Sequence, residues 1–211
     1  MGQFLDLDAW PRRQLFDLFR TYEQPFFNVC APVDVTRLRQ TCRTSGAPFF
    51  AAYLYLSIRA ANEIEPFRYR LRGERVWVHD RIEAGTTVPA AGEAFAFAYV
   101  EHAKDFKTFE SNFRRERERL EANDDRLEPR DDRDDLIHYS TLPWISFTGI
   151  RHARRHDPAD SVPKIVFGKT YESEGKLLMP HSVDAHHALM DGLHVGRYFE
   201  RFQELLDSGV G

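Results

Sequence analysis

The stretch His186-His187-Ala188-Leu189-Met190-Asp191-Gly192 follows an apolar segment, 177–185, with the character of a strand and precedes a segment, 193–206, with helical periodicity. A strand that passes directly into a helix favours a chain that mixes both elements around one sheet. Imidazole titrates close to neutral pH, so a histidine can take up and return a proton at low cost. Catalytic side chains are often held at such junctions, because the neighbouring elements are rigid. The stretch therefore predicts a reactive histidine.

The composition is that of an ordered globular protein. Hydrophobic residues make up 42% of the 211 residues and charged residues 29%, a balance that excludes an intrinsically disordered chain. This length supports one sizeable hydrophobic core, so we expect a single domain over residues 1–211. The formal net charge of −4 argues against a nucleic-acid partner, because there is no excess of positive charge to neutralise phosphates.

The apolar segments are too short for a membrane protein. No stretch approaches the ~20 apolar residues of a membrane-spanning helix, and residues 1–8 lack the pattern of a secretory signal. Cys30 and Cys42 are not arranged as a metal-binding or redox pair, so we expect two free thiols. Together these features predict a cytoplasmic protein without a membrane partner.

Hydrophobic periodicity predicts an alternation of helices and strands. We expect helices over residues 9–22, 34–43, 48–63, 105–122 and 193–206, and strands over 26–33, 67–71, 75–79, 86–89, 94–100, 137–148, 164–171 and up to His186. The charged segment 123–135 is expected to be a solvated surface loop. Mixed elements with hairpin connections predict an α/β or α+β fold with a mixed sheet.

Four common catalytic signatures are absent. The chain has no Gly-rich phosphate loop, Rossmann fingerprint, Gly-x-Ser-x-Gly elbow or Cys-x-x-Cys pair, which argues against kinases, dehydrogenases and ordinary serine hydrolases. His181 and His194 are interpreted as structural or surface histidines, whereas His186 and His187 are costly to bury without hydrogen bonds. A metal site of His187, Asp191 and His194 remains an alternative, although Gly192 makes a continuous helix across them doubtful.

Three ordered segments resemble one known family. They are His-His-Ala-Leu-Met-Asp-Gly-Leu-His-Val over 186–195, Trp-Pro-Arg-Arg over 10–13 followed by Phe16, and Tyr-Ser-Thr-Leu-Pro-Trp-Ile-Ser-Phe over 139–147. In this order and spacing they resemble the chloramphenicol acetyltransferases, which use coenzyme A and a catalytic histidine. The dihydrolipoyl acyltransferase cores share the His-x-x-x-Asp-Gly part. The resemblance extends over nearly the full length of the chain.

The resemblance implies a fold, an assembly and a reaction. The fold is a two-layer α/β sandwich with a mixed β-sheet, and the assembly is a homotrimer with active sites at subunit interfaces. The reaction is acetyl transfer from acetyl-CoA, as co-substrate, to a hydroxyl of chloramphenicol or another small acceptor, without a metal. His187 matches the general base that deprotonates this hydroxyl, and Ser140 matches the donor that stabilises the tetrahedral oxyanion.

The resemblance also assigns supporting roles. Asp191 invites interpretation as the third member of a triad, but the family instead pairs this aspartate with an arginine that Arg12 matches. His186 is the structural neighbour of the base.

Two expected pocket positions depart from the family pattern. Phe19 stands where the resistance enzymes carry a tyrosine that holds the antibiotic, and Val166 where they carry a threonine. Phe26 and Phe27 keep the substrate-binding wall aromatic. Loss of two hydroxyls indicates a changed or poorer acceptor. The alternative is a trimer of the same fold that sequesters a small ligand without turnover.

Overall fold

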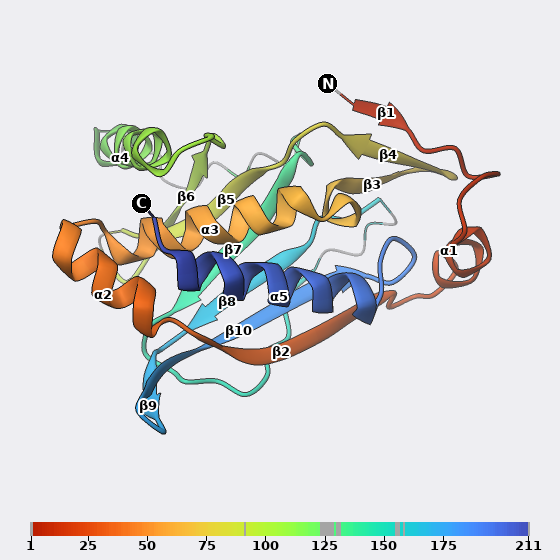
Figure 1. Cartoon of the computed structure of the whole chain (residues 1–211). Helices are drawn as coiled ribbons and strands as arrows, with labels where there is room; N and C mark the ends of the chain where they lie inside the picture. Colours follow the sequence, from red (N-terminus) through yellow and green to blue (C-terminus); the bar gives the residue numbers. More distant parts are fainter. Residues whose placement is uncertain are drawn as a thin grey trace.

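A large mixed sheet, covered on one face by helices, forms the body of the protein (Figure 1). The structure is a computed structural model that describes residues 2–90, 92–122, 129, 132–154, 157 and 159–210. Within these residues the sheet has seven strands: β2 (Phe26–Asp34), β5 (Glu83–Pro89), β6 (Phe95–Val100), β7 (Leu136–Leu142), β8 (Lys164–Gly168), β9 (Tyr171–Ser173) and β10 (Lys176–His186). The order is β2-β10-β8-β7-β5-β6, with β9 on β10.

The sheet combines antiparallel and parallel pairs. β10 pairs antiparallel with β2, β8 and β9, and β5 pairs antiparallel with β6, while β7 is parallel to both β5 and β8. The predicted mixed sheet is therefore confirmed, and the strand that ends at His186 lies inside it.

The helices form the second layer. α2 (Thr36–Ser45), α3 (Phe49–Glu63) and α5 (Gly192–Ser208) lie over one face of the sheet, and α4 (Phe106–Ala122) packs against β6 and α3 (Figure 1). α3 has ten buried side chains because apolar residues surround most of its circumference. We call the sheet face under α3 and α5 the inner face, and the opposite face the outer face.

The inner face contains a buried group of hydrogen-bonded side chains. The Ser57 hydroxyl lies 3.1 Å from the hydroxyl of Tyr139 and 2.6 Å from that of Tyr198, which lies 3.0 Å from Nε2 of His181. Burial lowers the pKa of His181 to about 3, so this ring is neutral at pH 7. His181 is thus a structural histidine, as predicted.

A smaller sheet supports the N-terminal segment. β1 (Gly2–Phe4), β4 (Arg75–His79) and β3 (Tyr69–Arg72) pair in the order β1-β4-β3. The short 3₁₀ helix η1 (Glu65–Arg68) directly precedes β3. Phe16 of α1 (Arg13–Phe19), Leu71 and Leu189 belong to the hydrophobic cluster beside this sheet. The cluster joins α1 to the segment that follows β10.

Several predicted boundaries were wrong: the strand expected over 164–171 ends at Gly168, and residues 67 and 68 of the strand expected over 67–71 belong to η1. The helix expected over 9–22 is only the seven-residue α1, and the strand expected to reach Thr148 ends at Leu142, directly before Pro143. The charged segment 123–135 was expected to be a solvated loop. Its residues 123–128 and 130–131 lie outside the described residues. Arg133, Asp134 and Asp135 are only partly exposed and form ion pairs.

Candidate active site

His187 lies in a tight turn between β10 and α5. We call residues 186–192 the histidine loop. The His186 carbonyl accepts hydrogen bonds from the backbone N–H groups of Leu189 (3.0 Å) and Met190 (3.2 Å), which close the turn. The N–H of His187 donates to the Pro25 carbonyl (2.7 Å) at the start of β2. The backbone of the loop is therefore held at both ends.

The His187 ring is fixed between aromatic side chains. The ring of Phe19 stacks on it, with centroids 3.9 Å apart and planes 5° from parallel, and the Phe27 ring lies 4.7 Å away. Nδ1 is buried without a hydrogen-bond partner, and no described residue bonds Nε2. Two apolar contacts thus orient the imidazole, while Nε2 is left available to a ligand.

An ion pair joins the histidine loop to the N-terminal segment, as predicted. Nη1 of Arg12 donates to the Asp191 carboxylate, and Nη2 donates to the His187 carbonyl (3.2 Å). Burial alone would raise the pKa of Asp191, but Arg12 and His194 more than offset it, so the pKa lies below its ordinary value. Asp191 also caps α5 by accepting from the N–H of Leu193 (3.0 Å). Arg12 therefore contacts the loop on both sides of the turn.

His186 is held as a neutral, buried ring. Its Nδ1 accepts a hydrogen bond from the N–H of Ala188 (3.2 Å), and its ring meets Phe26 edge to face. Burial, with a smaller contribution from Arg154, lowers the pKa of His186 to about 4. Since Nδ1 accepts a hydrogen bond from the backbone of the loop, the ring stabilises the turn.

Ser140 lies at a different place, on the floor of a cavity over the outer face. Tyr139 points into the core, so the alternation along β7 directs Ser140 to the opposite face. The Ser140 hydroxyl is partly exposed, and no described residue forms a hydrogen bond with it. The cavity, which we call the serine cavity, has a volume of about 760 Å³. Its floor is formed by outer-face residues of β5, β6 and β7: Gly85, Thr87, Phe97, Tyr99, His138 and Ser140.

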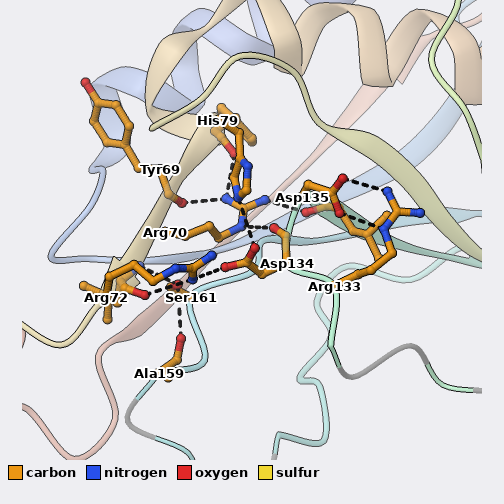
Figure 2. A network of polar contacts seen from close by, with 12 residues as sticks. Tyr69, Arg70, Arg72, His79, Arg133, Asp134, Asp135, Ala159 and Ser161 are labelled. Atoms are coloured by element: carbon orange, nitrogen blue, oxygen red, sulfur yellow. Dashed lines mark hydrogen bonds and ion pairs between the residues drawn. The ribbon is translucent and has the colours of Figure 1, made fainter. Parts of the chain in front are cut away.

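Ion pairs form the rim of the serine cavity. Arg72 pairs with Asp134, Arg133 with Asp135 (2.7 Å) and Arg154 with Asp160 (2.8 Å). Figure 2 shows the network at one side of this rim, where the buried Arg70 donates to backbone carbonyl groups at the start of β7. The rim is thus largely neutralised by internal pairs, whereas the floor carries aromatic rings and the partly exposed side chain of Ser140.

The two predicted catalytic residues are far apart within one chain. Ser140 pairs with Val166, which pairs with Ser182, so Ser140 lies two strands across the sheet from Ser182. His187 follows Ser182 by five residues along β10. At ordinary strand spacings the Cα atoms of Ser140 and His187 are roughly 15–20 Å apart. One chain therefore does not bring the imidazole to the serine.

Residues 3–203 match the chloramphenicol acetyltransferase family. The chain belongs to this family. A solved chloramphenicol acetyltransferase has the same fold, with a TM-score of 0.87 and 29% identity over 98% of this chain and 100% of that chain. Chloramphenicol acetyltransferase 3 of Escherichia coli is 29% identical over 206 residues, or 96% of each chain, and the Proteus mirabilis enzyme is 26% identical over 97% of this chain and 94% of its own.

Membership in the chloramphenicol acetyltransferase family makes the protein an acyltransferase and confirms the predicted two-layer α/β fold. A more distant structure, a catalytic core of the 2-oxoacid dehydrogenase complex from Thermoplasma acidophilum, shares the fold alone, with 17% identity and a TM-score of 0.66. Among the described residues no helix is both long and apolar enough to cross a membrane, and no three His, Cys, Asp or Glu side chains are grouped as a metal site.

The predicted substrate-binding residues of this chloramphenicol acetyltransferase homologue fall into two groups. Phe19, Phe26 and Phe27 surround the histidine pair, whereas Val166 lies next to Ser140 on β8 and is fully buried. Their role in substrate binding stays a prediction. His138 and Gly85 were missed by the sequence analysis, although the spacing of two residues between His138 and Ser140 on one strand was a usable signal.

Proposed function

We propose that this protein transfers an acetyl group from acetyl-CoA to a hydroxyl of a small, partly apolar acceptor. The observation that carries the proposal is the His187 ring, which is fixed by Phe19 and leaves Nε2 without a protein partner at the surface of a family acyltransferase. A fixed base with a free nitrogen suits proton abstraction from a bound alcohol.

The proposed reaction needs one base and one donor. Nε2 of His187 takes the acceptor hydroxyl proton, and the acceptor oxygen attacks the thioester carbonyl carbon. The Ser140 hydroxyl donates a hydrogen bond to the resulting oxyanion, a contribution worth about 3 kcal/mol in comparable sites. The intermediate collapses with loss of the CoA thiolate, which receives the proton from the imidazolium. The products are the acetyl ester and free CoA.

This chemistry requires two copies of the chain. Because Ser140 and His187 of one chain are roughly 15–20 Å apart, we propose that the His187 of one subunit faces the serine cavity of its neighbour. Exposed apolar side chains near both places support an interface: Leu15, Leu18 and Tyr22 on or beside α1, and Trp144 and Ile145 after β7. A head-to-tail contact that closes on itself forms a ring, and we propose a homotrimer.

The serine cavity suggests the acceptor class. Its volume of about 760 Å³ suits a molecule of drug size, and the aromatic floor with the Ser140 hydroxyl suits a hydroxylated, uncharged compound. Chloramphenicol is the first acceptor to test, and its acetylation would give a basis for antibiotic resistance. The free thiols Cys30 and Cys42 support a cytoplasmic location. We assign the activity to a single domain over residues 1–211.

A subunit-mixing experiment tests the proposal. Neither His187→Ala nor Ser140→Ala should turn over chloramphenicol at an appreciable rate when expressed alone. When the two variants are co-expressed in equal amounts, random trimers should regain about a quarter of the wild-type rate, because one site in each mixed trimer receives both intact side chains. A thiol-release assay with acetyl-CoA measures the rate, and gel filtration measures the oligomer.

Each other outcome has a defined meaning. Failure of the mixed sample to exceed the separate variants would contradict the shared site. Wild-type protein that binds chloramphenicol in calorimetry but neither binds acetyl-CoA nor releases CoA would support the ligand-sequestering trimer instead. A His187→Ala variant with full activity would rule out this residue as the base.

A further inference from the structure

His138 presents an unused polar side chain to the serine cavity. It precedes Ser140 by two residues on β7, so both side chains lie on the outer face, about 7 Å apart along the strand. The His138 ring is exposed to the cavity, and no described residue forms a hydrogen bond with either ring nitrogen. This histidine is therefore not needed to satisfy a polar group of the fold.

The neighbours of His138 in the sheet leave the ring free. Across the sheet, His138 pairs with Gly85 on one side and Lys164 on the other, and Gly85 pairs with Tyr99. The ammonium of Lys164 donates to the carbonyl of Ala153 (2.7 Å). The ammonium group of Lys164 thus already has a hydrogen-bond partner, and Gly85 has no side chain that could bond to His138.

The lack of a side chain at Gly85 matters because two aromatic rings lie beside it. Its backbone does not adopt a positive φ, and a Cβ at this position would meet the ring of Tyr99 at 3.5 Å and that of His138 at 3.6 Å, which are ordinary contacts. A glycine inside a strand weakens the strand and often marks a close approach by another group. A single Cβ therefore fits beside both rings, whereas a side chain that extends beyond Cβ would displace them into the cavity.

The charge state of His138 suits an uncharged partner. The protein atoms packed around the ring desolvate it, and this desolvation, together with the Lys164 cation, lowers the pKa of His138 to about 4. The ring is consequently neutral at pH 7, with one nitrogen that donates and one that accepts.

We propose that His138, positioned by Gly85, determines acceptor specificity by hydrogen bonding to a second polar group of the acceptor, about 7 Å from the reacting hydroxyl oxygen near Ser140. The inference rests on the proposed acetyl transfer and names the acceptor class: an uncharged, hydroxylated molecule with a further polar substituent at this spacing. A small alcohol that fills only the space beside Ser140 does not reach His138.

Two acceptors and five variants test this inference. Chloramphenicol is long enough to extend from Ser140 to His138, whereas propane-1,3-diol is not. His138→Phe keeps the flat ring and removes both nitrogens, so the KM for chloramphenicol should rise about tenfold. His138→Gln keeps a donor and an acceptor and should recover most of this loss. The KM for acetyl-CoA, and kcat/KM for the diol, should not change in either variant.

Gly85 gives an independent series. Gly85→Ala should leave the KM for chloramphenicol unchanged within about twofold, because its Cβ makes only ordinary contacts, whereas Gly85→Val should raise the KM about tenfold, because its extra methyl groups displace the Tyr99 and His138 rings. Gly196→Ala is the matched control, since Gly196 is an exposed helical glycine with open space around it. Thermal unfolding of Gly85→Val should show a cooperative transition well above the assay temperature, which separates lost binding from lost structure.

The outcomes separate the inference from the proposed function. Wild-type turnover of chloramphenicol with an unchanged KM in His138→Phe would overturn the role of His138 alone. Equal losses for chloramphenicol, the diol and acetyl-CoA would indicate general damage to the site and would also overturn it. Wild-type protein that turns over neither acceptor would overturn the proposed function, and the inference with it.

Discussion

The histidine loop and the serine cavity differ in how far their functional side chains have contacts and hydrogen-bond partners within one chain. In the histidine loop, Arg12, Pro25 and Phe19 hold the backbone and ring of His187 by contacts from three other segments. In the serine cavity, Ser140 and His138 have no side-chain partner among the described residues. The proposed base is thus held within one chain, and the proposed acceptor pocket is left open.

This difference is what the proposed site, shared between two copies of the chain, requires. A base must be oriented before the substrate arrives, because its reorganisation during the reaction would raise the barrier. A binding pocket must instead keep free hydrogen-bonding groups until the ligand supplies their partners.

The largest effect is expected at the base. His187→Ala should lower kcat by about 10³–10⁴-fold, because no other described side chain replaces Nε2 at this position. The KM for chloramphenicol should change little, since the serine cavity stays intact. Steady-state kinetics provide the measurement, and an unchanged melting temperature is the control.

Ser140→Ala should have a somewhat smaller effect on the other side of the comparison. Loss of one oxyanion donor should lower kcat by about 10²–10³-fold, and Ser140→Cys should not restore it, because a thiol is a weak donor. Calorimetric binding of acetyl-CoA should remain. A variant with less than twofold loss would show that another group stabilises the oxyanion.

The histidine loop should also be sensitive to acid. The pKa of buried His186 lies near 4, below the ordinary value of 6.5, so the unfolded chain binds a proton that the folded chain excludes between these values. The free energy of unfolding should therefore fall by about 3 kcal/mol as the pH drops from 7 to 4 because of this residue. His186→Asn keeps an acceptor for the Ala188 N–H, and its urea unfolding should show a correspondingly weaker pH dependence. Buried His181 contributes equally to both proteins, so an identical slope would disprove the effect.

Asp191 should matter more for stability than its partner Arg12. Asp191→Ala removes both the ion pair and the N-cap of α5 and should cost about 2–3 kcal/mol, whereas Arg12→Ala should cost about 1 kcal/mol less. Asp191→Asn keeps the cap and should behave like Arg12→Ala. Denaturant titration gives these values, and equal losses in Asp191→Ala and Asp191→Asn would remove the capping contribution.

The smallest effect is expected at Phe19, where the histidine loop of one subunit would face the serine cavity of its neighbour. Phe19 stacks on His187, and the family resemblance places a tyrosine at this position. Phe19→Tyr should lower the KM for chloramphenicol by about two- to fivefold, because it adds one hydrogen bond beside the base. Phe27→Tyr is the comparison variant, and an equal gain there would show that the position of the hydroxyl is unimportant.

The histidine loop was the part most accessible to prediction. The strand before His186 and the helix after Asp191 have clear periodicities, and the spacing of the three resembling segments led to the Arg12–Asp191 pair. Local sequence overestimated α1, because Trp10 continues the apolar pattern while it packs edge to face on Tyr69 outside the helix. The excess length of β7 has a similar origin, because the apolar pattern continues beyond Pro143, which has no N–H to extend the ladder.

The serine cavity was less accessible, because its floor depends on register between strands that are distant in sequence. Gly85, Tyr99 and His138 are neighbours only through the pairing of β5 with β6 and β7. Nothing in the local sequence of β5 predicts which residue of β7 lies beside Gly85. The burial of Val166 has the same character, since it depends on what covers the outer face of β8.

The Arg12–Asp191 pair joins positions that are 179 residues apart. During synthesis, the partner of Arg12 emerges from the ribosome only after every strand of the large sheet has been translated. We therefore expect the His187 imidazole to reach its final orientation late in folding, and incomplete polypeptides to carry the α1 segment that contacts it without the proposed activity.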